Sequence, residues 1–587
     1  MIPGNYKESD PFDCVKSRTF QLEWVAIIAV LLAALSFSLL RVDTTDTPWH
    51  LATAQLAFDS GHWPTKNTFS YTFPNYTLYQ QYPFYQGLLY LVYRNVGWSG
   101  LSLLNCAGWL GIFCLWIAWG GNWRWAATFS SLWLLGLLGL QRRMILRPEL
   151  MTMFLFICQL HLIDLYRRGR TWVAGLFVLN QFLLANSHQL FPLGLVAQVC
   201  LLAHLVLVRA RGGHWGIDTA DRKVPILPVI LALAGSLAAC FATPIGVDIF
   251  AGITHTVGSL FYHRNEVSEF APFYTSPYDT VLVAIAFCFA AFAFWKERGK
   301  WRPYEAGLWL LGAGLAVMAI RGVPFFVILS IAIFSRGQVR SLTSPILNKW
   351  NRSRCLLASI VIVLCVFFIR IWWISPAQTL GRIQTGIGRT LGDWPDKAIE
   401  FLRTSPPPGR MMNLSWYSGN ALIWGLYPDH RVFVDPRFET YPRNFLLSAI
   451  DSYNDDTHLR SLIDKYQPNW IVAELRLQPV RKRAAALIKS RLWSLVYADT
   501  IFMILVRESP SNAEYLAAYR ILPQEISPSD LLIRRPDLLG LQYVRLAMLY
   551  RDLGVEEKSA QMIGMAEPFQ VEYPAVRQAL QELKKYQ

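Results

Sequence analysis

Residues 21–40 read QLEWVAIIAVLLAALSFSLL, and the chain continues at once with RVDTTDTPWH over residues 41–50. The first stretch is apolar over about 20 residues, the length that a helix needs to cross a bilayer. Lys7, Lys16 and Arg18 precede it. A secretory signal peptide begins in the same way, but no small-x-small cleavage pattern follows. Residues 21–40 are therefore expected to remain as a membrane anchor.

The composition of the whole chain agrees with a membrane protein. Only 16% of the 587 residues are charged and 53% are hydrophobic, whereas soluble domains carry about 25% charged residues. The net charge of +15 would suggest a nucleic-acid partner in a soluble protein. In a membrane protein Lys and Arg collect in cytoplasmic loops instead, so no nucleic-acid partner is expected.

Apolar runs recur along the first 375 residues and predict about eleven spans. The spans are expected at residues 21–40, 100–119, 126–141, 149–166, 171–186, 190–208, 224–243, 279–295, 305–320, 323–335 and 355–375. With residues 1–20 as a cytoplasmic tail, the connectors that face the cytoplasm are all basic. They are 120–125, 167–170, 209–223, 296–304 and 336–354. This pattern predicts a multi-pass protein of the cell (inner) membrane, with loop 41–99 and everything after residue 375 outside the cytoplasm.

One outward connector departs from this pattern, because it carries Arg142, Arg143 and Arg147. Cations at this position do not help to orient the protein, so they point to a ligand. Guanidinium groups bind phosphate oxygens well, which favours phosphate recognition. Snorkelling or contact with lipid head groups is the alternative.

The pattern changes after residue 375, and residues 376–510 predict a small extracytoplasmic α/β domain. The expected strands are Arg410–Leu414, Arg431–Val434, Trp470–Ala473 and two that flank Asp499-Thr500; the expected helices lie near 396–404, 457–466 and 478–490. Residues 511–587 are expected to be helical. Five small or hydrophobic residues there have the spacing of one tetratricopeptide-like hairpin: Leu546, Tyr550, Gly554, Ala560 and Ala566. One such unit would pack on the α/β domain or bind a protein partner.

Two aspartates and a histidine follow the first predicted span, namely Asp43, Asp46 and His50. A carboxylate at the membrane interface can act as a general base on the hydroxyl or amine of an acceptor at the same depth. Asp46 could instead cap a short interfacial helix. The aromatic residues between Tyr76 and Tyr85 suit a segment that lies in the head-group zone.

Other outward connectors carry further polar candidates. They are Asn186 and His188 at a predicted helix-helix turn, Glu266 and Glu269 beside His263 and Arg264, Arg321 between two short spans, and Asp435 and Arg437 directly after a predicted strand. A lone histidine at such a turn is more often a structural hydrogen-bonding group. The motif Asp435-Pro436-Arg437 is either a strand-end turn with a local ion pair or a contact to a site at the membrane. Because there is no P-loop, dinucleotide fingerprint or metalloprotease motif, nucleotide-driven chemistry is not expected.

The order and spacing of these motifs resemble bacterial GT-C-type membrane glycosyltransferase-like proteins. The matching segments are Asp46-x-x-Trp49-His50-Leu51, Gly61-x-x-Pro64, Phe69-Ser70-Tyr71-Thr72, Arg147-Pro148-Glu149-Leu150, Asn186-Ser187-His188, Glu269-Phe270-Ala271-Pro272, Arg321-Gly322-Val323-Pro324 and Val434-Asp435-Pro436-Arg437. The resemblance covers most of residues 25–510. The wider superfamily includes protein O-mannosyltransferases, oligosaccharyltransferases and aminoarabinose transferases, which move a sugar from a polyprenyl-phosphate donor to an acceptor outside the cytoplasm.

The resemblance implies a GT-C-like transmembrane domain over residues 21–375, including the outer loop 41–99. It also implies Asp46 as the base with His50 beside it, and arginine cations on the donor phosphate. The substrate-binding candidates are Asp43, Arg142, Arg143, Arg147, Glu149, Asn186, His188, Glu269, Arg321, Asp435 and Arg437. No metal or other cofactor is expected if arginine balances the phosphate. The stretch Gln80–Gln86 carries no carboxylate, whereas the related loops have an acidic or His-Glu pair there. This difference argues against a second acidic role and a loop-bound metal.

The hypothesis from sequence is therefore an inverting membrane glycosyltransferase. A non-catalytic polytopic scaffold or lipid-binding envelope-assembly protein is the main alternative. A transporter is a third hypothesis, against which stand the few charges within the spans and the lack of an inverted repeat. A cavity that opens outward at Asp46 and the arginines would favour the enzyme, and one that crosses the membrane would favour transport.

Overall fold

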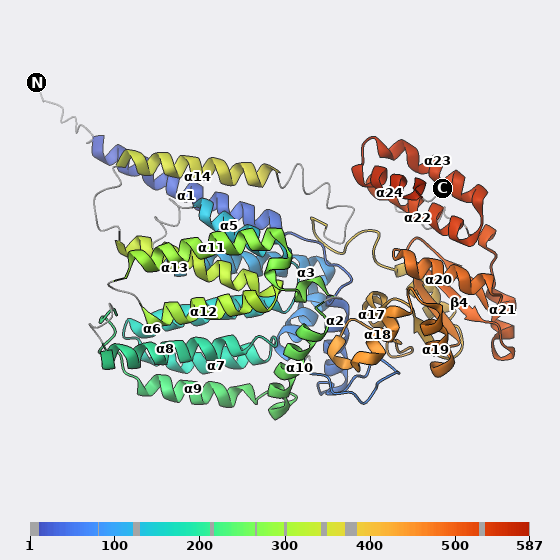
Figure 1. The fold of residues 1–587 in the computed structure, drawn as a ribbon, viewed down its shortest axis with the longest axis horizontal. Helices are drawn as coiled ribbons and strands as arrows, with labels where there is room; N and C mark the ends of the chain where they lie inside the picture. Colours follow the sequence, from blue (N-terminus) through green and yellow to red (C-terminus); the bar gives the residue numbers. More distant parts are fainter. Residues whose placement is uncertain are drawn as a thin grey trace, which may run out of the picture. The chain divides into compact units, whose positions relative to one another are not determined.

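The computed structural model of this protein describes residues 11–79, 81–120, 130–211, 217–264, 267–298, 302–341, 349–369, 384–526 and 535–585 (Figure 1). The chain divides into two compact units. The first comprises Met1–Leu39 and Leu103–Trp373, and the second comprises Leu40–Ser102 and Ile374–Gln587. The predicted outer loop 41–99 thus folds with the C-terminal part of the chain, whereas the domain prediction counted it with the transmembrane domain. Residues 1–10 of the predicted cytoplasmic tail lie outside the described residues.

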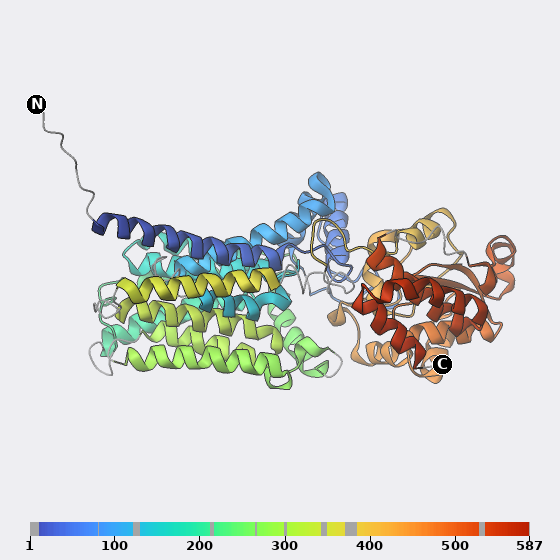
Figure 2. The same ribbon diagram turned by 90° about the horizontal axis from the view of Figure 1, so that it is seen from above.

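The first unit is mainly a bundle of apolar helices, most of which run side by side in both views (Figures 1 and 2). Its helices are α1 (Pro11–Ser38), α5 (Ser130–Leu140), α6 (Glu149–Arg167), α7 (Ala174–Ala185), α8 (Pro192–Arg211), α9 (Leu227–Cys240), α10 (Ile249–Tyr262), α11 (Pro277–Lys296), α12 (Pro303–Met318), α13 (Val323–Ser341) and α14 (Lys349–Ile369), together with the second half of α3 (Pro83–Trp119). A helix coincides with each of the predicted spans.

Five helical segments in the described residues are long and apolar enough to cross a membrane. They are Pro83–Trp119, Glu149–Arg167, Pro192–Ala210, Pro277–Lys296 and Ile320–Gly337. Shorter apolar helices lie at Leu22–Ser38, Thr171–Ala185, Leu227–Cys240 and Leu356–Phe368. The chain is therefore a membrane protein, and the number of crossings and their orientation stay predictions.

The predicted connector 244–278 contains a helix that the sequence did not lead us to expect. Helix α10 buries Ile249 and packs Phe250 and Ile253 against Leu184 and Phe191. Two short 3-10 helices follow, η4 (Ser268–Phe270) and η5 (Phe273–Thr275). Polar residues such as Thr254 and His255 interrupt the apolar pattern of α10, and this hid the helix in the sequence.

A four-stranded sheet forms the core of the second unit. Its strands are β1 (Met411–Asn413), β2 (Trp470–Glu474), β3 (Trp493–Ala498) and β4 (Phe502–Arg507), in the order β1-β2-β4-β3. Strands β1 and β2 are parallel, with Met411 opposite Trp470, and the other two pairings are antiparallel. Four of the five predicted strands are confirmed. The prediction of a strand at Arg431–Val434 is wrong, because Val432 makes only an isolated bridge to Ser70 of the predicted outer loop.

Helices surround this sheet. They are α2 (Thr47–Ser60), α16 (Asp396–Thr404), α17 (Gly419–Leu426), α18 (Arg443–Asp451), α19 (Asp456–Tyr466), α20 (Gln478–Lys489) and α21 (Ala513–Tyr519), followed by the C-terminal helices α22 (Pro536–Leu553), α23 (Glu556–Ala566) and α24 (Pro574–Lys584). Helix α2 packs on α17. The predicted helices near 396–404, 457–466 and 478–490 correspond to α16, α19 and α20.

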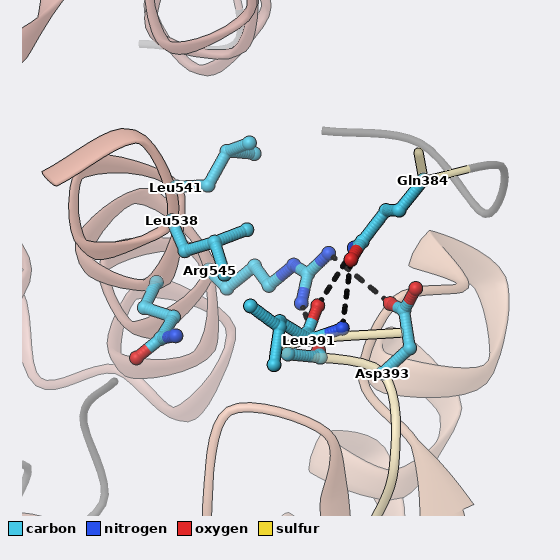
Figure 3. A pocket seen from close by; sticks show the side chains of 8 residues that line it. Gln384, Leu391, Asp393, Leu538, Leu541 and Arg545 are labelled. Carbon is cyan, nitrogen blue, oxygen red and sulfur yellow. Dashed lines mark hydrogen bonds and ion pairs between the residues drawn. The ribbon is translucent and has the colours of Figure 1, made fainter. Parts of the chain in front are cut away.

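The C-terminal helices pack on the α/β part of the second unit. Arg481 of α20 donates from Nε to Oδ2 of Asp552 on α22 at 2.5 Å, and both side chains are buried. Arg545 of α22 donates to the carbonyl oxygen of Gly392 at 3.1 Å. Figure 3 shows the small hollow at this junction, where Arg545 reaches from α22 toward Gln384 and Asp393. One of the two predicted roles of this region, packing on the α/β domain, is thus observed; a protein partner stays a prediction.

Candidate functional site

Six of the sequence candidates meet at one end of the helix bundle in the first unit. They are Arg143, Arg147, Glu149, His188, Glu269 and Arg321, and we call them the Glu269 cluster. They come from the turn after α5, the start of α6, the α7–α8 turn, η4 and η6 (Ile320–Gly322). Residues more than 150 positions apart in the sequence, from Arg143 to Arg321, therefore form one charged group.

Glu269 lies at the centre of this cluster. Its Oε2 lies 2.9 Å from Nη1 of Arg143. Nη1 of Arg147 donates to Oε1 and Oε2 of Glu269 at 3.1 and 3.2 Å. Glu149 makes a looser contact, 3.6 Å from Nη1 of Arg143. One carboxylate thus bridges two guanidinium groups, as a phosphate with two oxygens can.

Local structure explains why these side chains converge. Pro148 occupies the N-cap position of α6, so Glu149 lies in the first helical turn, where the helix dipole favours a carboxylate. The backbone N–H of Ile320 donates to the carbonyl oxygen of Ala271 at 2.8 Å and joins η4 to η6. The Arg321 guanidinium stacks over the buried Phe270 ring, 4.4 Å from its centroid. This stacking holds Glu269 and Arg321 side by side.

The cluster changes the ionisation of its members. Burial alone would raise the pKa of Glu269, but Arg147, Arg143 and Arg321 outweigh burial and hold this pKa well below its usual range. Burial lowers the pKa of His188 to about 4; Glu149 opposes this shift, and Arg321 and Arg143 add to it. His188 is therefore neutral at pH 7, and its Nδ1 lies 2.9 Å from Oγ1 of Thr152.

Two of the predicted residues near the cluster have other partners. Arg142 is 56% exposed, pairs with Asp279 at 3.0 Å and stacks over the Tyr278 ring. Asn186 donates from Nδ2 to the carbonyl oxygens of Phe182 and Ala242, each at 3.0 Å, and so joins the ends of α7 and α9. These contacts favour a structural role for Asn186. Glu266 lies outside the described residues.

The second unit holds the other sequence candidates, beginning with Asp46. Asp46 occupies the N-cap position of α2 and is partly exposed, and its side chain makes no capping hydrogen bond. The helix-cap alternative is therefore not what holds this carboxylate in place. A partly exposed carboxylate is accessible to an acceptor, which suits a proton-accepting group.

His50 is buried on the first turns of α2. The centroid of its ring lies 3.7 Å from that of Trp49, with the two rings tilted by 34°, and 5.2 Å from that of Tyr85, which it meets edge-on. Its Nδ1 lies 3.1 Å from Nε2 of Gln86. Since His50 is 1% exposed, its packing favours a role in holding α2 in place. Gln86 belongs to the stretch Gln80–Gln86, which carries no carboxylate. This stretch thus supplies a hydrogen-bonding partner for His50.

Asp43 organises the chain just before α2. Its Oδ1 accepts hydrogen bonds from the backbone N–H of Thr45 at 3.1 Å and from the Thr45 hydroxyl at 2.6 Å. Such a pattern is an Asx turn, a common local use of aspartate. A turn-forming role therefore accounts for Asp43 better than substrate contact.

Asp435 and Arg437 form a fully buried ion pair. Arg437 donates from Nε and Nη2 to the two Asp435 oxygens, each at 2.7 Å, and Nη2 also donates to Oδ1 of Asn67 at 2.8 Å. Tyr441 donates to Asp435 at 2.5 Å. Burial would lower the pKa of Arg437, but Asp435 outweighs burial and raises it. The pair ties the segment around Asn67 to the α/β part, in agreement with the structural alternative, a strand-end turn with a local ion pair.

A second charged group lies at the opposite end of α6, and the sequence did not reveal it. Arg336 contacts Asp164 at 2.6 Å, Glu305 at 3.1 Å and the Tyr304 hydroxyl at 2.9 Å. Arg167 pairs with Asp221 at 2.6 Å, and His204 lies 2.8 Å from the same carboxylate oxygen. We call these seven residues the Arg336 network. Charged residues at the ends of apolar runs, such as Asp164, were the signal that could have pointed to it.

Within the described residues, no group of three or more His, Cys, Asp or Glu side chains is arranged to hold a metal ion. The chemistry that the described side chains offer is that of arginine on an anion and of carboxylate on a proton. These two abilities lie in different units, the first in the Glu269 cluster and the second at Asp46.

Comparison with known proteins gives the fold. No protein-family model and no curated protein matches this chain. A solved structure of the archaeal oligosaccharyltransferase AglB from Archaeoglobus fulgidus, in complex with an inhibitory peptide and a dolichol-phosphate, is similar. Its TM-score is 0.50 at 11% identity, over 81% of this chain and 73% of that chain.

A structure of an Archaeoglobus fulgidus oligosaccharyltransferase with zinc and sulfate has a TM-score of 0.49 at 12% identity, over 82% of this chain and 73% of that one. At such identity the AglB likeness shows the fold alone. The chain thus has a fold similar to that of this archaeal oligosaccharyltransferase, and membership of the GT-C superfamily stays a prediction. Its relation to particular bacterial members stays a prediction.

Proposed function

We propose that this chain is a membrane glycosyltransferase that takes a sugar from a polyprenyl-phosphate donor and passes it to an acceptor outside the cytoplasm. The observation that carries the proposal is the Glu269 cluster, where Arg143, Arg147 and Arg321 converge at one end of an apolar bundle. A lipid-linked phosphate presents its charge at that kind of place, where a hydrophobic bundle ends. The similar AglB structure is a complex with a dolichol-phosphate, a lipid of the same chemical class.

The arginines carry the donor half of the proposal. When the bond between the sugar and the phosphate breaks, negative charge develops on the phosphate oxygens. Guanidinium groups fixed in advance stabilise this charge more than they stabilise the intact donor. Arg143 is held by its contacts in a buried position, so little reorganisation is needed during the reaction. Arg142 is exposed and paired with Asp279, so we assign it an accessory role in donor binding.

Asp46 carries the acceptor half of the proposal. Its carboxylate takes the proton from the acceptor hydroxyl or amine while that atom forms the new bond to the sugar and the phosphate leaves. General-base groups of this kind contribute about a hundredfold to ten-thousandfold in rate. An Asp46→Asn variant is expected to bind donor normally and to lose turnover. His50, packed beside Trp49, acts as a positioning residue in this scheme.

The proposal is tested with purified protein in nanodiscs and a radiolabelled polyprenyl-phosphate sugar. The R143Q/R147Q double variant is expected to bind the donor at least about tenfold more weakly, because two charge-assisted contacts are lost. Its transfer activity falls with binding. Donor binding that is equal in the wild type and the double variant would contradict the proposal. Binding without transfer to any acceptor would favour the scaffold alternative.

The orientation that belongs with this function is an inner-membrane protein with a cytoplasmic N-terminus. The basic connectors support it. Labelling of a single cysteine introduced at Asp248, an exposed residue of the predicted outer loop, checks it. An impermeant reagent is expected to label this site in intact cells, and labelling only after lysis would reverse the topology.

A further inference from the structure

Glu269 is placed where an entering phosphate would have to bind. Its two oxygens contact Nη1 of both Arg143 and Arg147 at 2.9–3.2 Å. These are the charge-assisted contacts that we assign to the donor phosphate. A phosphate that takes these Nη1 groups has to displace the Glu269 carboxylate from them.

Exposure identifies which partner can leave. The Glu269 side chain is 39% exposed, whereas the side chains of Arg143 and Arg147 are 8% and 17% exposed. Glu149, the other carboxylate of the cluster, is 14% exposed and lies on the first turn of α6. Glu269 is therefore the carboxylate of the cluster whose side chain can turn into solvent when a ligand takes its place.

The backbone that follows Glu269 is anchored independently of its carboxylate. Phe270 is buried under the Arg321 guanidinium, and Ala271 accepts a hydrogen bond from the backbone of Ile320. A change of side-chain rotamer is therefore enough to release the two arginines. No movement of a helix is needed.

The charges of the cluster fit an exchange between carboxylate and phosphate. Arg143, Arg147 and Arg321 contribute three positive charges, and Glu149 and Glu269 contribute two negative ones, which leaves one positive charge. Without Glu269 the arginines and Glu149 sum to two positive charges. A sugar phosphodiester carries one negative charge, and the phosphomonoester left after transfer carries up to about two. The site thus has the charge to hold both the donor and the product once Glu269 has moved away.

We propose that Glu269 is a built-in place-holder for the lipid-linked phosphate, which closes the Arg143–Arg147 pair in the empty site and returns to expel the polyprenyl-phosphate product. This inference rests on the proposed function and adds a competing group to its donor site. Removing the carboxylate should strengthen binding of the phosphate. A residue that merely supports the arginines would have the opposite effect when it is removed.

The test compares binding of a short-chain polyprenyl phosphate to full-length wild type, E269Q, R147Q and D248N in phosphatidylcholine nanodiscs. E269Q is expected to bind at least about fivefold more tightly, because no carboxylate then competes with the phosphate for Arg143 and Arg147. R147Q should bind at least about tenfold more weakly. D248N is the matched control, because it removes an exposed carboxylate from the same predicted loop without touching the cluster. Its affinity should match the wild type.

The outcomes separate this inference from the proposed function. Equal or weaker binding by E269Q, together with weak binding by R147Q, would overturn the place-holder and leave the donor site standing. An equal gain in affinity in E269Q and D248N would show that the gain comes from net charge alone. This outcome would also overturn the place-holder role of Glu269. Absence of binding in every protein would overturn the donor site and the place-holder together. E269D, whose shorter side chain bridges both arginines less well, is expected to lie between wild type and E269Q, and it serves if E269Q does not fold.

Discussion

The two ends of α6 carry two arginine–carboxylate groups that differ in their access to solvent. At the start of α6, the Glu269 cluster has a carboxylate that is 39% exposed. At its end, the Arg336 network encloses Glu305, whose side chain is 1% exposed, and Asp164, which is also largely buried. Both groups pair arginines with carboxylates. Only the open one can exchange an internal carboxylate for a ligand.

We take this difference to distinguish the proposed donor site from a structural clamp. In the Arg336 network each cation contacts carboxylates from other elements, so Arg336 of α13 is joined to α6 and α12. Such contacts leave no donor for a ligand to take. In the Glu269 cluster the arginines are held in position while their most exposed partner can leave. The comparison predicts opposite phenotypes for arginine substitutions at the two ends.

The largest effect is expected from Arg336→Gln. This change leaves Asp164 and Glu305 buried without their main cation, which typically costs about 3–5 kcal/mol. We expect a strong loss of folded protein and a large drop in the midpoint of thermal unfolding in detergent. Arg147→Gln is the matched substitution at the open end and should cost clearly less, because Glu269 is partly exposed and keeps its contact with Arg143. Equal destabilisation by the two variants would break the comparison.

A comparable loss is expected from Arg437→Gln in the second unit. Arg437 is 1% exposed and Asp435 is fully buried, so the pair is as sealed as the Arg336 network. Removing the cation leaves a buried carboxylate and costs about 3–5 kcal/mol. Limited proteolysis of the full chain should then cut the second unit more readily. If Arg437→Gln lost transfer activity without losing stability, the Asp435–Arg437 pair would instead be assigned to substrate contact.

A pH-dependent effect of intermediate size is expected from His188. Its pKa is about 4 in the folded protein, against an ordinary value of 6.5. The unfolded chain therefore binds a proton that the folded chain does not, and stability falls as the pH drops from 6.5 toward 4. Thermal unfolding between pH 7 and 5 should show a steeper loss in wild type than in His188→Gln. Glutamates titrate mainly below this pH window, so they contribute little to the difference. Identical slopes for the two proteins would mean that His188 is not held neutral.

The smallest effect is expected from Asp43→Asn. The Asx turn at Asp43 is local and partly exposed, so its loss costs about 0.5–1 kcal/mol. Transfer activity should stay within about twofold of wild type, because the turn is weakened and no reacting group is lost. A rate loss as large as that of the Asp46 variant would assign Asp43 to the chemistry.

Much of the fold could be predicted from sequence, because apolar runs and basic connectors are properties of short segments. The helices of the bundle apart from α10, the four strands of the sheet and α16, α19 and α20 were found in this way. Helix α10 and the true role of Arg431–Val434 were missed. In both cases the structure depends on a distant partner, such as Ser70 for Val432, that no local pattern contains.

The candidate site shows the same limit. Arg143, Arg147, Glu269 and Arg321 were each identified from sequence by a charge in an outward connector. Their pairing was not predicted, because an ion pair between Arg147 and Glu269 joins residues 122 positions apart. The Arg336 network was missed for the same reason, since Asp164 and Arg336 belong to separate helices. Sequence found the charged residues, and only the fold shows which of them can open to a ligand.

The central claim is that this protein transfers sugar from a lipid-linked donor and that Asp46 accepts the proton. It is tested most directly by turnover of a polyprenyl-phosphate sugar with purified wild type, Asp46→Asn and the matched control Asp43→Asn. We expect transfer by wild type and by Asp43→Asn, a loss of kcat of about a hundredfold or more in Asp46→Asn, and unchanged donor binding. Undiminished turnover by Asp46→Asn would contradict the role of Asp46, and no transfer by wild type would contradict the enzyme itself.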